Sequence, residues 1–368
     1  MTKDFLLHYV SYRTIFAIKS SKNKPDIDFR RIFILMYKSR LFYISLLILS
    51  IILPFSAHSQ QYQDTLRFFE PSPTLHKGRF YKALAFSSTT YTGFSIGLYQ
   101  AWYKQYEQEG FHFFNDWNEW QNIDKYGHVY TSYFQGVLCY KGAKWTGLDD
   151  DDAILAGVVC ASLFQTTIEV MDGFSSKWGF SVSDFAANTV GISAFYFQQK
   201  YWGEQRILFK VSSWPISYSD DPIRDTDGNL SSSVNNRAND LFGSSFAGRF
   251  IKDYNAQTIW LSVNVDAFLP ENNSWPDWLN IALGYSGQNM FGGFSNSWQE
   301  ENRSYILESS QDRYQQFVLG LDIDLTRIQT DNYFLKSLLS IFNIFKLPSP
   351  AIEYTTQGEW QFHLMYLN

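Results

Sequence analysis

The sequence is poor in charge and in cysteine. Charged residues make up 18% of the 368 residues, the formal net charge is -6 at pH 7, and lysine and arginine form no basic stripe. A nucleic-acid partner is therefore not expected. The two cysteines, Cys139 and Cys160, lie in apolar runs. We expect free buried thiols that act as small hydrophobic residues, with a disulfide between neighbouring helices as the alternative in an oxidising compartment.

Signatures of catalysis are also scarce. The chain has six histidines, but none of them forms a His-Glu-x-x-His pair, and no serine or cysteine nucleophile stands out. Aromatic residues are abundant instead, because 33 Phe, 24 Tyr and 12 Trp make up 19% of the chain. Such rings suit interfaces that are apolar on one side and wet on the other.

The N-terminal region has the pattern of an export signal. Two basic residues precede an apolar run over residues 41–55, and a small-x-small cleavage site follows at residues 57–59. This order is typical of a secretory signal peptide, and the run is short for a membrane span. We expect residues 1–59 to be an over-extended start plus a signal peptide, with Met36 as the true start and an uncleaved anchor as the alternative. The protein would then be exported, to the periplasm or the outer membrane.

Residues 80–205 are expected to form a helical domain. Their apolar positions recur with the period of an α-helix. Four helices are predicted, over about residues 81–106, 122–141, 149–172 and 183–201. The acidic run at residues 149–152 resembles a calcium loop, but acidic residues also favour a helix N-terminus, and we expect the latter.

Residues 206–368 are expected to form an antiparallel β-rich domain, because the apolar period changes to two. Strands are predicted near residues 209–218, 259–267, 279–285, 317–325, 351–354 and 360–366, with an amphipathic helix at 335–345. The overall class is therefore α+β. The strands fit either a sheet on a core or a partial or closed β-barrel with lipid outside. Further strands within 241–251 or 290–307 would be needed to close a barrel.

Polar residues interrupt the apolar helical sequence in pairs. The pairs are Asp124 with His128, Glu169 with Asp172, and Asp184 with Asn188. Residues three or four apart share a helix face, and a buried charge is costly unless it is paired or bound to a metal. We therefore expect the six side chains to converge in one candidate site. Whether this site holds a cofactor or a metal is left open by the sequence.

Structural explanations compete with a functional one. Ser181 and Asp184 form a capping box, so Asp184 could serve only to close a helix N-terminus. Gly173 after Asp172 is typical of a helix C-terminus. His128 could be a core histidine satisfied by Asp124. The six residues are thus either a catalytic cluster or a structural polar network.

Several of these motifs together resemble a known family. Residues 111–116, the Asp124-Lys125-x-x-His128 step, residues 168–175 and the Ser183-Asp184-x-x-x-Asn188 segment resemble the YfiM-like family of predicted periplasmic lipoproteins, a domain of unknown function. The resemblance covers roughly residues 80–205, and residues 252–258 are similar to longer members with a strand-rich C-terminal part. It implies an exported envelope protein and supplies no activity. No cysteine stands at the expected cleavage site, which departs from a lipoprotein.

Three classes of function remain. The first is an exported cell-envelope protein with a structural or binding role, whose partners are a membrane surface or other envelope components. The second is an envelope enzyme acting on a lipid or cell-wall substrate, with His128 as general base and Asp124 orienting it. Glu169 or Asp172 would then be a second acid or base, or a metal ligand. The third is an outer-membrane β-barrel or pore. The outward faces of the strands would distinguish a membrane protein, by an apolar belt edged with Trp and Tyr, from a soluble one.

Overall fold

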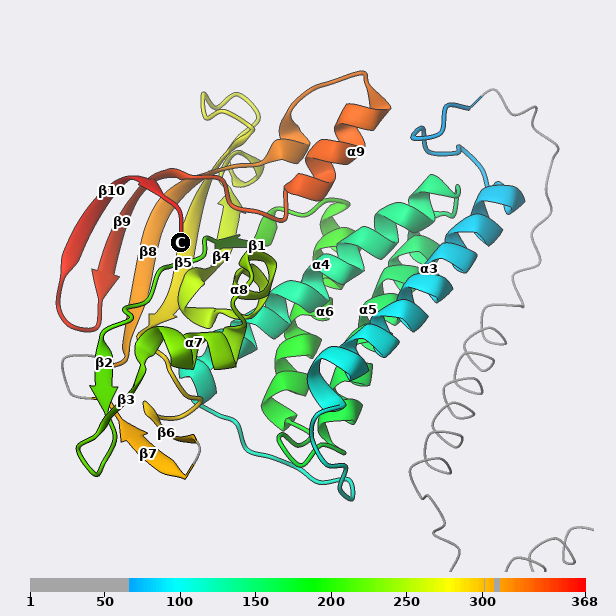
Figure 1. Ribbon diagram of the computed structural model, residues 1–368. Coiled ribbons are helices and arrows are strands. Elements are labelled where there is room, and N and C mark those ends of the chain that lie inside the picture. Colours follow the sequence, from blue (N-terminus) through cyan, green and yellow to red (C-terminus); the bar gives the residue numbers. More distant parts are fainter. Residues whose placement is uncertain (1–65, 301, 308–311) are drawn as a thin grey trace, which may run out of the picture. The chain divides into compact units, whose positions relative to one another are not determined.

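The computed structural model describes residues 66–300, 302–307 and 312–368, which belong to one compact unit. The expected over-extended start and signal peptide, residues 1–59, lie outside the described residues. Four long helices come first, followed by a six-stranded antiparallel sheet that is not closed (Figure 1). The predicted α+β class and its order of helices and strands are therefore confirmed.

The four helices begin close to where the apolar pattern predicts. They are α3 (Lys77–Leu98), α4 (Ile123–Trp145), α5 (Asp150–Asp172) and α6 (Val182–Trp202). Asp149 accepts a hydrogen bond from the backbone N–H of Asp152, so it is the N-cap of α5, and the acidic run behind it lies in the first turn. This agrees with the preference of acidic residues for a helix N-terminus. Helix α5 is also long and apolar enough to cross a membrane by length and composition, as many core helices are.

The expectation of free thiols is wrong. Cys139 of α4 and Cys160 of α5 form a disulfide. Both residues lie in apolar helical runs, as expected, but the two helices pack side by side and bring the sulfur atoms together. Helical periodicity shows which face of each helix is buried. It does not show which buried positions of two helices meet, and this is why the disulfide was only the alternative in the sequence analysis.

The main sheet has the strand order β1-β4-β5-β8-β9-β10, and every neighbouring pair is antiparallel. Its strands are β1 (Ile207–Ser213), β4 (Gln257–Asn264), β5 (Leu279–Gln288), β8 (Tyr314–Ile323), β9 (Ser349–Thr355) and β10 (Trp360–Tyr366). The helical period thus gives way to strands at Ile207, as predicted. The strands are longest where the alternation is most regular, in β5 and β8.

Short elements fill the connections. They are the hairpins β2 (Pro222–Arg224) with β3 (Leu230–Ser233) and β6 (Ser297–Glu300) with β7 (Arg303–Ile306), and the helices α7 (Val234–Phe242), α8 (Phe246–Lys252) and α9 (Tyr333–Phe342). Of the two segments in which more strands were sought, 290–307 contains β6 and β7, which form a two-stranded sheet separate from the main sheet. Segment 241–251 is largely helical.

Helix α4 joins the helices to the sheet, because it packs against α5 and α6 on one side and against β1, β4 and β5 on the other (Figure 1). The rings of Tyr133 and Phe209 lie 5.2 Å apart, and those of Tyr126 and Tyr285 lie 4.6 Å apart. Ile123, at the start of α4, is buried against Ile259 of β4. The first turns of α4, which carry Asp124 and His128, are thereby fixed between the two halves of the fold.

Candidate functional site

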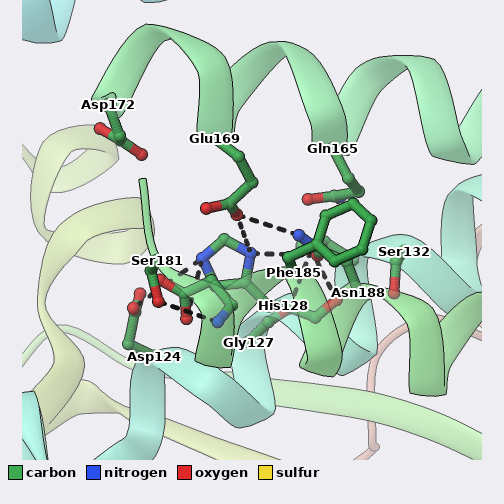
Figure 2. Close-up of polar contacts among 12 residues, drawn as sticks. Asp124, Gly127, His128, Ser132, Gln165, Glu169, Asp172, Ser181, Phe185 and Asn188 are labelled. Carbon is green, nitrogen blue, oxygen red and sulfur yellow. Dashed lines mark hydrogen bonds and ion pairs between the residues drawn. The ribbon is translucent and has the colours of Figure 1, made fainter. Parts of the chain in front are cut away.

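Helices α4, α5 and α6 meet around His128. Asp124 and His128 face the interior from α4, Glu169 faces them from α5, and Asn188 faces them from α6 (Figure 2). Asp184 of α6 joins them, with its Oδ1 3.8 Å from Nε2 of His128. Gly191 allows α6 to approach α4 closely, because a Cβ at this position would overlap the Ser132 hydroxyl and the Val129 carbonyl. The fold therefore brings five of the six expected residues into one network.

His128 is in contact with polar groups at both ring nitrogens. Its Nδ1 lies 3.1 Å from Oδ1 of Asn188 and 3.6 Å from Oε1 of Glu169. Its Nε2 lies 3.8 Å from Oδ2 of Asp124 and 3.8 Å from Oδ1 of Asp184. Asn188 also donates its Nδ2 to Oε1 of Glu169 at 3.0 Å. The imidazole is thus surrounded by three carboxyl groups and one amide.

Lys125 is a second cation in the network. Its Nζ lies 2.6 Å from Oδ2 of Asp116, 2.7 Å from Oδ1 of Asp184 and 3.3 Å from Oδ2 of Asp124. The Lys125 side chain is only 9% exposed. A buried ammonium needs such partners, since removing it from water is costly. Lys125 therefore links the loop before α4 to the N-terminus of α6.

Residues outside the six predicted ones complete the network. Ser181 and Ser183 each donate to Oδ1 of Asp116, at 2.7 and 2.6 Å. Tyr254, which precedes β4, donates to Oδ1 of Asp124 at 2.6 Å. Oδ1 of Asp116 and Oδ1 of Asp124 are thereby held by donors from other segments of the chain.

Asp172 lies apart from the network. Figure 2 shows it one turn further along α5 than Glu169. It accepts a hydrogen bond from the Tyr103 hydroxyl at 2.8 Å, and its carboxyl is close enough to Glu169 and His128 to influence them electrostatically. Asp172 is thus a neighbour of the network rather than a contact of His128.

The capping explanation for Asp184 also has a structural basis. Ser181 is the N-cap of α6 and accepts a hydrogen bond from the backbone N–H of Asp184 at 3.0 Å. The Asp184 carboxylate, however, points to Lys125. One residue thus takes part in the cap through its backbone and in the network through its side chain.

Burial and neighbouring charges shift the pKa values of the network. Burial alone would lower the pKa of His128, but Asp124, Asp184 and Glu169 outweigh it and raise that pKa to about 9. Burial raises the pKa of Asp184 and of Asp172 to about 8, and that of Glu169 to about 7. His128 is therefore an imidazolium ion at neutral pH, and protons remain on part of the carboxyl groups.

Asp116 shifts in the opposite direction. Burial works against its charged form, but hydrogen bonds from Asp184, Lys125 and the two serines hold the pKa of this carboxyl well below its usual range. Lys125 responds to the same neighbours, which hold its pKa above the usual value despite burial. At neutral pH the network therefore contains a persistent ion pair between Lys125 and Asp116.

Asp124, His128 and Asp184 could also be considered as metal ligands, because each offers an atom within 4.8 Å of the others. A divalent ion would need a neutral imidazole and ionised carboxylates. Lys125 already contacts both carboxylates, and its ammonium would repel the ion. The three residues are therefore better described as members of an ionic network that includes Lys125 than as ligands of a metal ion.

No nucleophile motif was expected, but the sequence does contain a Gly-x-Ser-x-Gly pattern, at Gly93–Gly97. In esterases this pattern forms a turn between a strand and a helix, which exposes the serine. Here it lies inside α3, and Ser95 is 2% exposed. The pattern is therefore part of a packed helix, and Ser95 is not placed as a nucleophile.

Residues 108–200 match the family model described as "Predicted periplasmic lipoprotein (DUF2279)". This match confirms the resemblance seen in the sequence, and it includes every residue predicted for the site. The description gives no activity. No curated protein and no solved structure matches the chain. The comparison is consistent with an exported envelope protein, and the chemistry has to be argued from the network itself.

Proposed function

We propose that the protein is an exported envelope protein with a structural or binding role, in which the network around His128 holds α4, α5 and α6 together. This proposal rests on the charge of His128. A general base must accept a proton near the working pH, whereas three carboxyl groups raise the pKa of this histidine to about 9. A protonated imidazole donates hydrogen bonds and compensates buried carboxylates.

The contacts of the network support the same role. Lys125 and His128 provide two positive charges, and each contacts carboxyl groups from more than one segment. Removing one partner from a buried ionic network is strongly destabilising, typically by about 3–5 kcal/mol. Through the network, the packing of each of the three helices therefore depends on the other two.

The test is to measure the pKa of His128 by NMR in the full protein, with thermal melts of His128→Gln and of Lys200→Gln as a control. Lys200 lies on the surface of α6 and pairs with Asp151 at 2.6 Å. We expect a His128 pKa near 9 and a clear loss of stability in His128→Gln alone. A pKa below 7 with unchanged stability would restore the general-base alternative.

A metal role is tested in the same preparation. The melting temperature of the parent should be unchanged by a chelator and by added Zn²⁺, because Lys125 occupies the place of the cation. A rise with Zn²⁺ that disappears in His128→Gln would instead assign the residues to a metal centre.

Processing of the N-terminus is part of this proposal. The apolar run at residues 41–55 and the small residues at 57–59 are read as a cleaved signal peptide. Mass spectrometry of protein isolated from cells should give an N-terminus near Gln60 without a lipid, since no cysteine stands at this site. Recovery of a chain that still begins at Met1 would contradict export by this route.

A further inference from the structure

The inner face of the six-stranded sheet carries many buried polar side chains beside one apolar cluster around Trp260, and the outer face is apolar. Lys210, Ser262, Asn264, Asn280 and Asp322 all point to the inner face, and each is completely buried. They contact one another: Lys210 pairs with Oδ2 of Asp322 at 2.7 Å, and the Ser262 hydroxyl donates to the same oxygen at 2.7 Å. Soluble antiparallel sheets normally place the apolar face on the core and the polar face in water.

The inner face is shielded from solvent, because the sheet curls over it. Trp260 of β4 and Tyr366 of β10 are separated by β5, β8 and β9 in the sheet order. Their ring centroids are nevertheless 5.5 Å apart. The curled sheet thus encloses its own polar interior and turns its other face outward.

The outer face presents registered rows of apolar side chains. The central row crosses the sheet through Leu283, Leu319, Ile352 and Phe362, which are paired strand to strand. These four side chains are 54%, 49%, 46% and 66% exposed. Among the outward positions of β5, β8 and β9, whose residues are all described, none is charged. We call this surface, from β5 to β10, the apolar belt.

Aromatic residues mark one end of the apolar belt. The row Tyr285, Phe317, Tyr354 and Trp360 runs across the same four strands, again in register. Beyond it the chain becomes polar, at Gln288, Gln315 and Thr356. Tyr and Trp, which make up three of these four rings, are favoured where a membrane meets water, because they are apolar with a polar tip.

Trp278 and helix α9 mark the other end. Trp278 precedes β5 and is 42% exposed. Helix α9 lies between the end of β8 and the start of β9, and its exposed side chains include Phe334, Leu338 and Ile341. Amphipathic helices with such a face lie in the plane of a membrane interface. From Leu279 to Tyr285 the belt spans seven residues, and the six steps between them correspond to roughly 20 Å of strand.

We propose that the apolar belt contacts the acyl chains of a lipid bilayer. The belt is continuous with the apolar surface of β1 and β4, which α4 covers through contacts such as that between Tyr133 and Phe209. The cover ends at the edge of the belt, where the ring of Tyr126 lies 4.6 Å from that of Tyr285. The same kind of surface is thus sealed by a helix on one side of the sheet and left uncovered on the other. Protein interfaces carry a polar rim and about one hydrogen bond per 100–200 Å². The outward positions of the belt supply neither charge nor regular polar groups, so lipid fits better than a second copy of the chain.

Flotation with vesicles of phosphatidylethanolamine and phosphatidylglycerol tests the proposal on the full protein. Leu283→Lys with Leu319→Lys places two charges in the central row, and Leu230→Lys with Ile306→Lys is the matched control. Leu230 and Ile306 are 57% and 66% exposed but belong to the short hairpins. We expect the first variant to lose at least about tenfold in vesicle binding, since lysine on a lipid-facing strand is costly. The control should bind as the parent does.

Several outcomes would overturn the proposal. One is a parent protein that stays in solution when vesicles float. Another is an equal loss of binding in both variants. A third is a parent that forms dimers without lipid, with only the belt variant becoming monomeric. The last result would assign the belt to contact between two copies.

A spin label covers the case in which the lysine variant fails to fold. The two cysteines of the chain are bonded to each other, so a label on Leu319→Cys has a single attachment site. With vesicles, this label should become accessible to oxygen and shielded from a water-soluble nickel reagent, whereas a label on Leu230→Cys should stay accessible to nickel. Equal nickel accessibility at both positions would overturn the proposal.

Discussion

The ammonium of Lys210 lies 2.7 Å from the carboxylate of Asp322, and both side chains are completely buried inside the curled sheet. Lys210 also donates to Oδ1 of Asn343 at 2.9 Å, and Asp322 accepts from Ser262. A pair so far from water is stable only while both members are present. The sheet interior is therefore sensitive to single changes.

Replacing Lys210 by methionine should destabilise the protein by about 3–5 kcal/mol, because the charge of Asp322 is left buried and unpaired. Replacing both residues, with Lys210→Met and Asp322→Leu, should cost less than the single change. Chemical denaturation of the parent and both variants measures this difference. Lys144→Met is the control, since Lys144 pairs with Asp150 at 2.9 Å on the surface and should change stability by less than about 1 kcal/mol. Additive losses in the double variant would contradict the coupling.

Lys125 and Lys200 provide a second matched comparison. Each lies 2.6 Å from a carboxylate, but the side chains of Lys125 and Asp116 are 9% and 7% exposed, and those of Lys200 and Asp151 are 40% and 75% exposed. We expect Lys125→Met to lower the free energy of unfolding by about 3–5 kcal/mol, and Lys200→Met by less than about 1 kcal/mol. Similar effects in denaturant melts would show that burial does not set the strength of this network.

The stability of the protein should fall as the pH rises from 6.5 to 9. Contacts with carboxyl groups raise the pKa of His128 from 6.5 to about 9, so the folded state holds this proton longer than the unfolded state does. The protonated His128 contributes about 3 kcal/mol to the free energy of unfolding. This contribution is complete below pH 6.5 and is lost as the pH passes 9. The pKa values of Asp184 and Asp172 are raised to about 8. Their protons therefore also stabilise the folded state, and this contribution is lost as the pH rises, beginning at a lower pH than for His128.

Melting temperatures of the parent and His128→Gln across this range test the effect. The parent should lose stability toward pH 9, and the variant should show a smaller slope because its side chain does not titrate. Equal slopes would show that His128 has the same pKa in the folded and unfolded states.

The close contact between α4 and α6 gives a prediction on packing. Gly191→Ala would place a methyl group against the Ser132 hydroxyl and the Val129 carbonyl, so the helices must separate. We expect the free energy of unfolding to fall by about 1–3 kcal/mol. The NMR signal of His128 should also change, because its Nδ1 contacts Asn188, which lies on α6 as Gly191 does. Gly142→Ala is the control, because it lies in α4 with open space around it and should stabilise that helix by up to about 1 kcal/mol. An unchanged free energy of unfolding in Gly191→Ala would show that α4 and α6 can move apart without loss of stability.

Local spacing predicted much of the site. A step of four residues turns an α-helix by about 40° beyond a full turn, whereas a step of three falls about 60° short. Asp124 with His128 and Asp184 with Asn188 therefore share a face closely, while Asp172 turns away from Glu169 and reaches Tyr103. Asp116, Lys125 and Tyr254 were noted only within the motifs of the family resemblance and were not predicted as site residues. Tyr254 is 130 residues from Asp124, and no local pattern records such a contact.

The fold was predictable where the apolar period persists for a whole element. The regular alternation of β5 and β8 identified both strands, whereas β6 and β7 have four residues each, which is too few for a period to be recognised. Alternation also assigns residues to two faces without saying which face is enclosed. For this sheet the enclosed face is polar, and only the three-dimensional arrangement of Trp260 and Tyr366 shows it.

The disulfide between Cys139 and Cys160 has a consequence for the order of events in the life of the protein. It joins α4 to α5, the helices that carry His128 and Glu169. Disulfides persist in oxidising compartments and are rare in the reducing cytoplasm. A chain that has not yet been exported would therefore carry two thiols, and its helices would rely on the charged network alone. The disulfide would form last, after translocation. The newly made protein and the mature protein would then differ in this covalent bond.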